Sequence, residues 1–190
     1  MPITFDEARS IALSRIGPEC ALIAAATLAK PYGWYFNYQN RACLEKRDGG
    51  QMLVGSGGFI VEREDGRVFE FGSAYPPETW LANYEQGYKY ERYDLMIRSV
   101  VDLATTLDGL ERLSMQYIVP ELEHGTLWNI PRTFTRQQLA DRLGRLPYMF
   151  ENQAFWHRIE EFEELKRSGC CECELRGRPT ADGPPGGPIA

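Results

Sequence analysis

The first segment of the chain has the spacing of a helix with one buried face. Thr4 precedes Glu7 by three positions, the spacing of a capping box that satisfies free amides at a helix start. Gly17 and Pro18 then end the pattern. Four apolar residues recur between these signals at helical intervals: Ala8, Ile11, Ala12 and Ile16. The pattern therefore predicts an N-terminal helix.

Short apolar and aromatic runs separated by turn residues follow this helix. Asp65 and Gly66 form a pair that accepts positive φ, so they favour the turn of a β-hairpin. Residues 39–58 are polar and rich in glycine, and we expect a loop there. Pro77 suits the first turn of a short helix, with Trp80, Leu81 and Tyr84 on one face. The predicted strands are residues 20–29, 34–38, 59–61, 67–71 and 95–101.

From residue 102 onward, helical and extended patterns alternate. Asp102 is a candidate N-cap for a helix with leucines at helical spacing, and Thr135 with Gln138 repeats the capping-box spacing. A strand at 127–130, an extended stretch from 147 and a helix over 159–168 follow. Residues 171–175 alternate Cys and Glu before Leu175, which is typical of a strand with one buried face. Residues 177–190 are rich in glycine and proline, and we expect a disordered tail.

These patterns predict an α+β protein. Its N-terminal helix packs on an antiparallel sheet built from hairpins, and an α/β-alternating C-terminal half follows. We expect one domain over residues 1–100, an extension or small second domain over 101–176, and the tail.

Composition agrees with a soluble globular chain. Of its 190 residues, 43% are hydrophobic and 25% charged, and the net charge is −6. A chain with this acidic balance is a poor non-specific binder of nucleic acid and suits a basic protein partner. No apolar run approaches the roughly 20 residues needed to cross a bilayer, and the first residues lack a secretory pattern. We therefore expect a cytoplasmic protein without nucleic-acid or membrane partners; the oligomeric state stays open.

The five cysteines and the glycine loop give no cofactor signature. An odd number of cysteines in a chain with no secretory pattern is typical of reduced thiols. Cys170 and Cys173 have zinc-ligand spacing but lack a matching second pair, so we expect no metal. The loop of residues 54–58 has neither the lysine of a P-loop nor a following helical pattern. We expect no cofactor.

Two histidines keep an enzymatic alternative open. His124 or His157, with a nearby carboxylate or Cys170, could form a small hydrolase-type site. However, neither histidine lies in a recognisable nucleophile motif, and His124 with Gly125 is more typical of a turn. We therefore predict a protein that is not an enzyme.

A tyrosine-rich segment and the acidic hairpin are the candidate contact residues. Tyrosine offers a large contact area with few torsions to order, so it recurs at protein interfaces. The alternative is that these tyrosines pack against the core. The candidate partner-binding residues are Tyr84, Tyr88, Tyr90 and Tyr93, with Glu62, Glu64 and Asp65 at the hairpin.

The order of motifs over residues 1–90 resembles the YrhB-like bacterial immunity-protein family. The strongest parts are the aromatic run that begins at Gly33, the hairpin turn at Asp65 and Gly66, and the segment 72–76 before the helix around Trp80. The resemblance implies a non-enzymatic immunity protein that binds a cognate toxin domain and neutralises it. A chaperone-like or regulatory module in the same fold is the other alternative.

Overall fold

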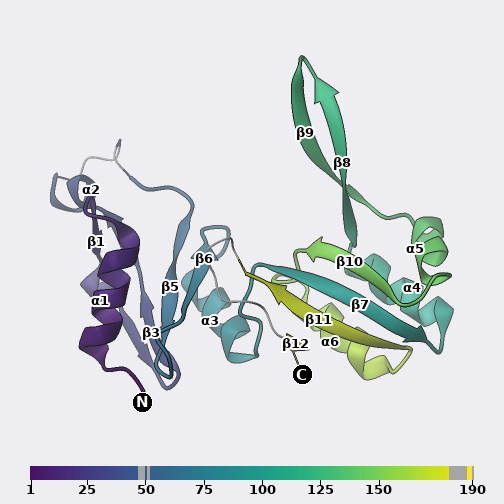
Figure 1. The fold of residues 1–190 in the computed structure, drawn as a ribbon, viewed down its shortest axis with the longest axis horizontal. Coiled ribbons are helices and arrows are strands. Elements are labelled where there is room, and N and C mark those ends of the chain that lie inside the picture. The colour runs from purple at the N-terminus through teal and green to yellow at the C-terminus, as the bar shows by residue number, and fades with distance from the viewer. Residues whose placement is uncertain (47–49, 51, 180–187, 190) are drawn as a thin grey trace. The chain divides into compact units, whose positions relative to one another are not determined.

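A computed structural model describes residues 1–46, 50, 52–179 and 188–189 (Figure 1). It divides into an N-terminal unit, residues 1–86, and a C-terminal unit, residues 87–179 with 188–189. The division falls between Gln86 and Gly87, earlier than the domain boundary expected near residue 100. That the two units are separate domains stays a prediction.

The N-terminal unit packs helix α1 (Phe5–Ile16) on an antiparallel sheet, and this confirms the α+β prediction (Figure 1). Thr4 and Glu7 form the predicted capping box, in which the Thr4 amide donates to the Glu7 carboxylate over 2.7 Å. Ala8 and Ala12 are fully buried, so the helix backbone lies close to the sheet. The sheet order is β2 (Leu28–Lys30), β3 (Gly33–Phe36), β5 (Ser56–Glu62), β6 (Val68–Gly72).

Two predictions in this unit need correction. The expected single strand over residues 20–29 is interrupted: β1 (Cys20–Leu22) and β2 flank a helical turn, η1 (Ala24–Ala26). The three alanines favour that turn because alanine has high helix propensity and low strand propensity. The expected loop after residue 38 contains β4 (Tyr38–Asn40), which pairs with β1, and helix α2 (Arg41–Lys46).

The β5–β6 hairpin and the helix after it follow the prediction. Gly66 has φ of +74°, the left-handed conformation that a glycine at this turn adopts without strain. Helix α3 (Pro77–Glu85) begins at Pro77. It buries Trp80, Leu81 and Tyr84 as one face. The Trp80 ring stacks on Phe71 of β6, with 5.5 Å between centroids, so α3 covers the end of the hairpin.

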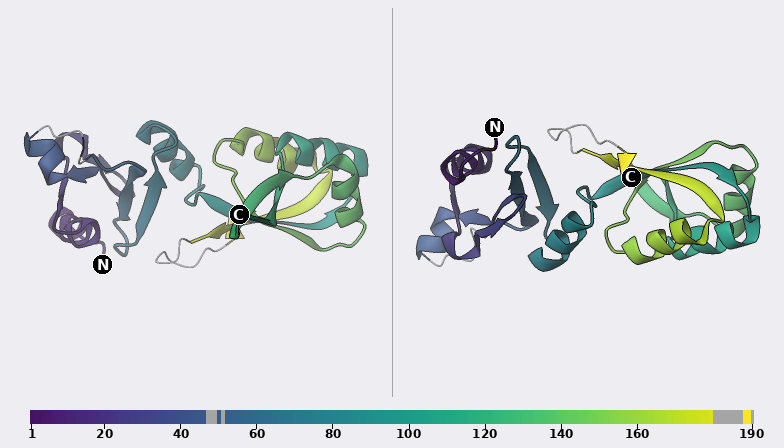
Figure 2. Two further views of the ribbon diagram at one scale, coloured as in Figure 1. Left: turned by 90° about the horizontal axis from the view of Figure 1, so that it is seen from above. Right: turned by 90° about the horizontal axis from the view of Figure 1, so that it is seen from below.

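The C-terminal unit is an antiparallel sheet with helices on one face (Figure 2). The sheet order is β10 (Tyr148–Gln153), β7 (Arg92–Val100), β11 (Cys171–Arg178), β12 (Pro188–Ile189). Helices α4 (Leu103–Arg112) and α6 (Ile159–Ser168) bury their leucine and phenylalanine stripes against it. Cys171 and Leu175 are buried while Glu172 is exposed, as the alternation in this segment predicted.

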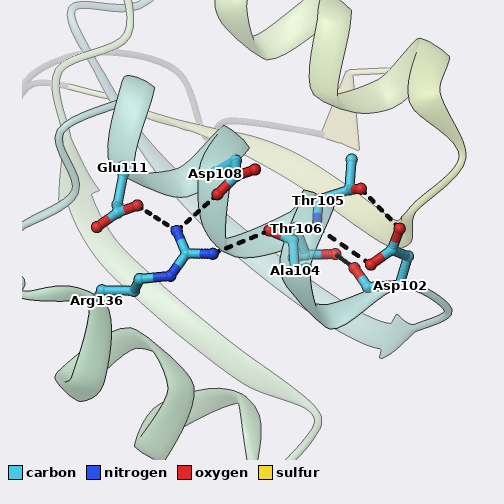
Figure 3. A network of polar contacts seen from close by, with 7 residues as sticks. All are labelled: Asp102, Ala104, Thr105, Thr106, Asp108, Glu111 and Arg136. Carbon is cyan, nitrogen blue, oxygen red and sulfur yellow. Dashed lines mark hydrogen bonds and ion pairs between the residues drawn. The ribbon is translucent and has the colours of Figure 1, made fainter.

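Polar contacts bind α4 to helix α5 (Arg136–Leu143) (Figure 3). The Asp102 side chain caps α4 by accepting from the Thr105 amide over 3.1 Å, as predicted. The Arg136 guanidinium donates to Asp108 over 2.6 Å and also to Glu111. One cation therefore joins two carboxylates of the neighbouring helix.

Besides the sheet, this unit contains a two-stranded ribbon that is longer than the sequence indicated. The prediction of a strand at 127–130 is confirmed, but β9 (Thr126–Thr133) also pairs along its whole length with β8 (Gln116–Glu123), which was not predicted. The two strands extend beyond the sheet as a separate ribbon (Figure 1).

The tail prediction is wrong at both ends of its range. Residues 177–178 belong to β11, and 188–189 form β12, which pairs with it. Residue 179 belongs to no helix or strand, and the rest of the predicted tail, residues 180–187 and 190, lies outside the described residues. No helix in the described ranges is long and apolar enough to cross a membrane.

Candidate partner-binding surfaces

The predicted tyrosines lie mostly in the interior. Tyr84, Tyr88 and Tyr93 are buried, and Tyr90 is half-buried. This burial favours the core-packing alternative over an exposed tyrosine surface. Tyr84 belongs to the N-terminal unit and the other three to the C-terminal unit. Partner binding through these tyrosines stays a prediction, and their burial does not support it.

Two of these tyrosines donate hydrogen bonds to glutamates distant in the sequence. The Tyr84 hydroxyl donates to Glu62 of β5, and the Tyr88 hydroxyl donates to Glu163 of α6. Burial, followed by the hydrogen bond to the carboxylate, raises the pKa of each phenol far above its usual value. Both hydroxyls therefore stay protonated and act as fixed donors.

The predicted hairpin acids separate into one buried and two exposed carboxylates. Glu62 is only 6% exposed and accepts from Tyr84, and its other oxygen lies 3.2 Å from Arg67. Asp65 is exposed and forms an ion pair with Arg67 over 2.6 Å, and Glu64 is exposed beside it. Glu62 therefore supports the hairpin, while Glu64 and Asp65, the acidic turn, face solvent.

A run of exposed apolar side chains precedes β5 and was missed in the sequence. Met52 is 56% exposed and Val54 85%, with Leu53 between them at 38%. We call Met52–Val54 the apolar loop. It borders a hollow of about 260 Å³. The hollow is lined further by Tyr38, Gly55, Gly58, Phe59, Glu70 and Phe71. Three consecutive apolar residues within a polar, glycine-rich stretch were the available signal.

The apolar loop is tied to the fold through the main chain of Leu53. The Leu53 amide donates to Oε1 of Gln39 over 2.5 Å, and Nε2 of Gln39 donates back to the Leu53 carbonyl over 3.3 Å. Gln39 lies on β4, so its side-chain amide replaces a neighbouring strand. The loop is held in position while its side chains remain exposed.

The structure places the residues of the hydrolase-type alternative in three different surroundings. His124 lies with positive φ in the β8–β9 turn, and its side chain is exposed. His157 lines a hollow of about 80 Å³, where burial, and then the nearby Arg158, lowers the pKa of the imidazole. Cys170 is buried. In the described part of the chain, no group of three or more His, Cys, Asp or Glu could hold a metal ion.

In comparisons with known proteins, the region that contains the apolar loop and the acidic turn matches a described protein family. Residues 18–86 match the family described as immunity protein 35. Uncharacterized protein YrhB of Escherichia coli (strain K12) is 38% identical over 53 residues, 28% of this chain and 56% of that protein. The chain thus spans about half the length of this relative. No solved structure matches the chain. The predicted resemblance to a YrhB-like immunity-protein family is confirmed for residues 18–86.

Proposed function

We propose that this protein is a non-enzymatic immunity protein that binds a cognate bacterial toxin domain in the cytoplasm and neutralises it. The observation that carries the proposal is the match of residues 18–86 to the immunity protein 35 family. Binding would block the toxin's active site or substrate channel by occlusion, so the immunity protein needs no catalytic group of its own.

The apolar loop is the proposed centre of the contact. Met52 and Val54 expose large apolar side chains in the middle of the matched region, and Leu53 and Val54 line the hollow bounded by Phe59 and Phe71. Buried apolar anchors at the centre of an interface supply most of its binding energy. Gln39 already holds the loop, so binding costs little additional ordering.

The acidic turn is a second proposed contact. Glu64 and Asp65 are exposed, and Arg67 neutralises only part of their charge. Rim carboxylates attract a basic partner and chiefly raise the association rate. We therefore assign Glu64 and Asp65 to steering and the apolar loop to affinity.

Calorimetric titration against the C-terminal domain of the protein encoded next to this one tests the proposal. The wild type should bind one-to-one and abolish that domain's toxicity in a growth assay. Met52→Gln/Val54→Gln should weaken binding by at least about tenfold. Leu28→Gln is the matched control, because Leu28 is a similarly exposed apolar residue on β2 of the same unit.

Two outcomes would count against this assignment. Absence of binding by the wild type would remove the toxin-neutralising function. Equal binding by Met52→Gln/Val54→Gln and Leu28→Gln would leave the function standing but move the contact away from the apolar loop. Glu64→Gln/Asp65→Asn should lower the association rate and its dependence on salt, with little change in the dissociation rate.

A further inference from the structure

The hollow beside the apolar loop combines apolar lining with one carboxylate. Leu53 and Val54 of the loop line it, together with Tyr38 and Phe59, whose ring centroids lie 5.8 Å apart. Glu70 of β6 also lines the hollow, and its side chain is 39% exposed. The hollow therefore offers a ligand both an apolar surface and a negative charge.

The main chain keeps this hollow open. Gly55 and Gly58 line it without side chains, at the point where the ladder between β5 and β6 shifts its register. A Cβ on Gly55 would meet no atom within 4 Å. Gln39 holds the neighbouring main chain of Leu53 by two hydrogen bonds. The hollow is therefore formed before a partner binds, which lowers the ordering cost of binding.

The carboxylate of Glu70 is held in position and can still accept further hydrogen bonds. Nε of Arg15, on α1, donates to Oε1 of Glu70 over 2.6 Å. Both side chains are about one-third exposed, so this ion pair adds little to stability. An ionised carboxylate accepts at about four positions, and the Nε–H of Arg15 fills one of them. Glu70 is therefore oriented by α1 while part of its acceptor capacity remains for a ligand.

The size and lining of the hollow select the kind of group that fits it. Its volume of about 260 Å³ is below the range of about 300–1,000 Å³ typical of small-molecule pockets, so it suits a single side chain. An apolar side chain would remove water from Glu70 without giving it a hydrogen-bond donor, which costs free energy. A long basic side chain packs its methylene stem on apolar lining and pairs its charged head with a carboxylate.

We propose that this hollow receives one basic side chain, a lysine or an arginine, of the toxin domain. The inference rests on the proposed function and names the chemistry of the partner's anchor. Residues 1–86 contain eleven acidic and eight basic side chains, so the N-terminal unit attracts a cation. The exposed acidic turn, Glu64 and Asp65, belongs to the same unit. The apolar loop supplies contact area, and Glu70 selects the charge of the group that enters.

Calorimetric titration of three variants of the full chain with the toxin domain tests this proposal. Glu70→Gln keeps the shape of the side chain but removes its charge, and should raise the dissociation constant at least about tenfold. Arg15→Gln removes the same ion pair but keeps the carboxylate, and should bind at least as tightly as the wild type. Glu85→Gln is the matched control, because Glu85 is an exposed carboxylate paired with Lys30 over 2.8 Å in the same unit. It should leave the dissociation constant unchanged, and circular dichroism should show that all three variants are folded.

The outcomes separate this inference from the proposed function. A wild type that does not bind the toxin domain overturns the function, and the inference with it. If the wild type binds and Glu70→Gln binds equally well, the function stands and the basic anchor is excluded. Equal weakening by Glu70→Gln and Arg15→Gln would assign the effect to their ion pair, and would also overturn the inference. Weakening by Glu70→Gln alone supports a basic side chain in the hollow.

Discussion

The side-chain amide of Gln153 pairs with the backbone of Gln116 as a neighbouring strand would. The Gln116 amide donates to Oε1 of Gln153, and Nε2 of Gln153 donates to the Gln116 carbonyl, each over 2.8 Å. Gln153 is only 4% exposed and ends β10, so the first residue of β8 is tied to the sheet of the same unit.

Replacing this buried amide should loosen the base of the β8–β9 ribbon. Gln153→Leu keeps the volume but leaves two backbone groups of Gln116 without partners, which should lower the free energy of unfolding by about 1–3 kcal/mol. Amide exchange should also rise in β8. Gln116→Ala is the control, because it keeps the backbone groups that Gln153 contacts. If both variants have the same free energy of unfolding, the pairing of the Gln153 amide with Gln116 contributes nothing to stability.

Tyr84 should behave as a core residue. Tyr84→Ala removes a ring that packs on Phe69 and Phe71, and should cost about 3–5 kcal/mol. Tyr84→Phe keeps the ring but leaves the Glu62 carboxylate without its phenol donor, and should cost about 1–3 kcal/mol. Urea unfolding measures both. Full stability of Tyr84→Ala would contradict the packing and return Tyr84 to the predicted contact surface.

The two glycines before β5 and within it should differ in their tolerance of a methyl group. A Cβ on Gly58, where φ is +82°, would lie 2.5 Å from the Tyr35 hydroxyl oxygen and 2.6 Å from the Phe36 carbonyl. Gly58→Ala should therefore cost more than the roughly 1–2 kcal/mol of backbone strain alone. Gly55, with φ of +103°, has open space around it. Gly55→Ala should therefore lose only the stability that corresponds to backbone strain. Equal losses of stability by the two variants in thermal unfolding would exclude the clash at Gly58.

His157 should make stability depend on pH. Burial lowers the pKa of His157 in the folded chain, so its unfolded state binds more protons as the solution is acidified. Its contribution is complete above the unfolded pKa of about 6.5 and is lost as pH falls through the lower folded pKa. Urea unfolding from about pH 7.5 to about pH 5.5 should show a shallower decline for His157→Gln than for wild type.

The exposed histidine provides the comparison for that experiment. His124→Gln alters a side chain that is 91% exposed in the β8–β9 turn. It should leave the free energy of unfolding at about pH 7.5 within about 0.5 kcal/mol of the wild type, because substitutions of exposed side chains have small effects. If His157→Gln does not change the decline of the unfolding free energy with falling pH, titratable groups other than His157 cause that decline.

Local signals in the sequence predicted the parts of the fold that depend on neighbouring residues. The capping boxes at Thr4 and Thr135 and the cap at Asp102 involve atoms three positions apart, so their spacing was sufficient. The hairpin turn at Gly66 is equally local. The helix α2 was missed because its surroundings are polar and rich in glycine, which hides a short helix.

The rest depends on contacts between distant residues. The Tyr88 ring packs on Phe162 and its hydroxyl donates to Glu163, both far along the chain, and no pattern within the tyrosine segment indicates this. The sequence of β8 lacks a clear alternation of apolar and polar residues, because its half-buried face carries Glu121 beside Tyr117 and Val119, and Pro120 interrupts the pattern. The apolar loop depends on Gln39, whose side chain pairs with Leu53.

The tether between Gln39 and Leu53 has an evolutionary consequence. Both of its hydrogen bonds use main-chain atoms of Leu53, so any residue except proline at that position retains them. Mutations at 52, 53 and 54 can therefore accumulate without displacing the segment. Under the proposed function, the three side chains can change to match a changing toxin while the backbone of the segment stays in place.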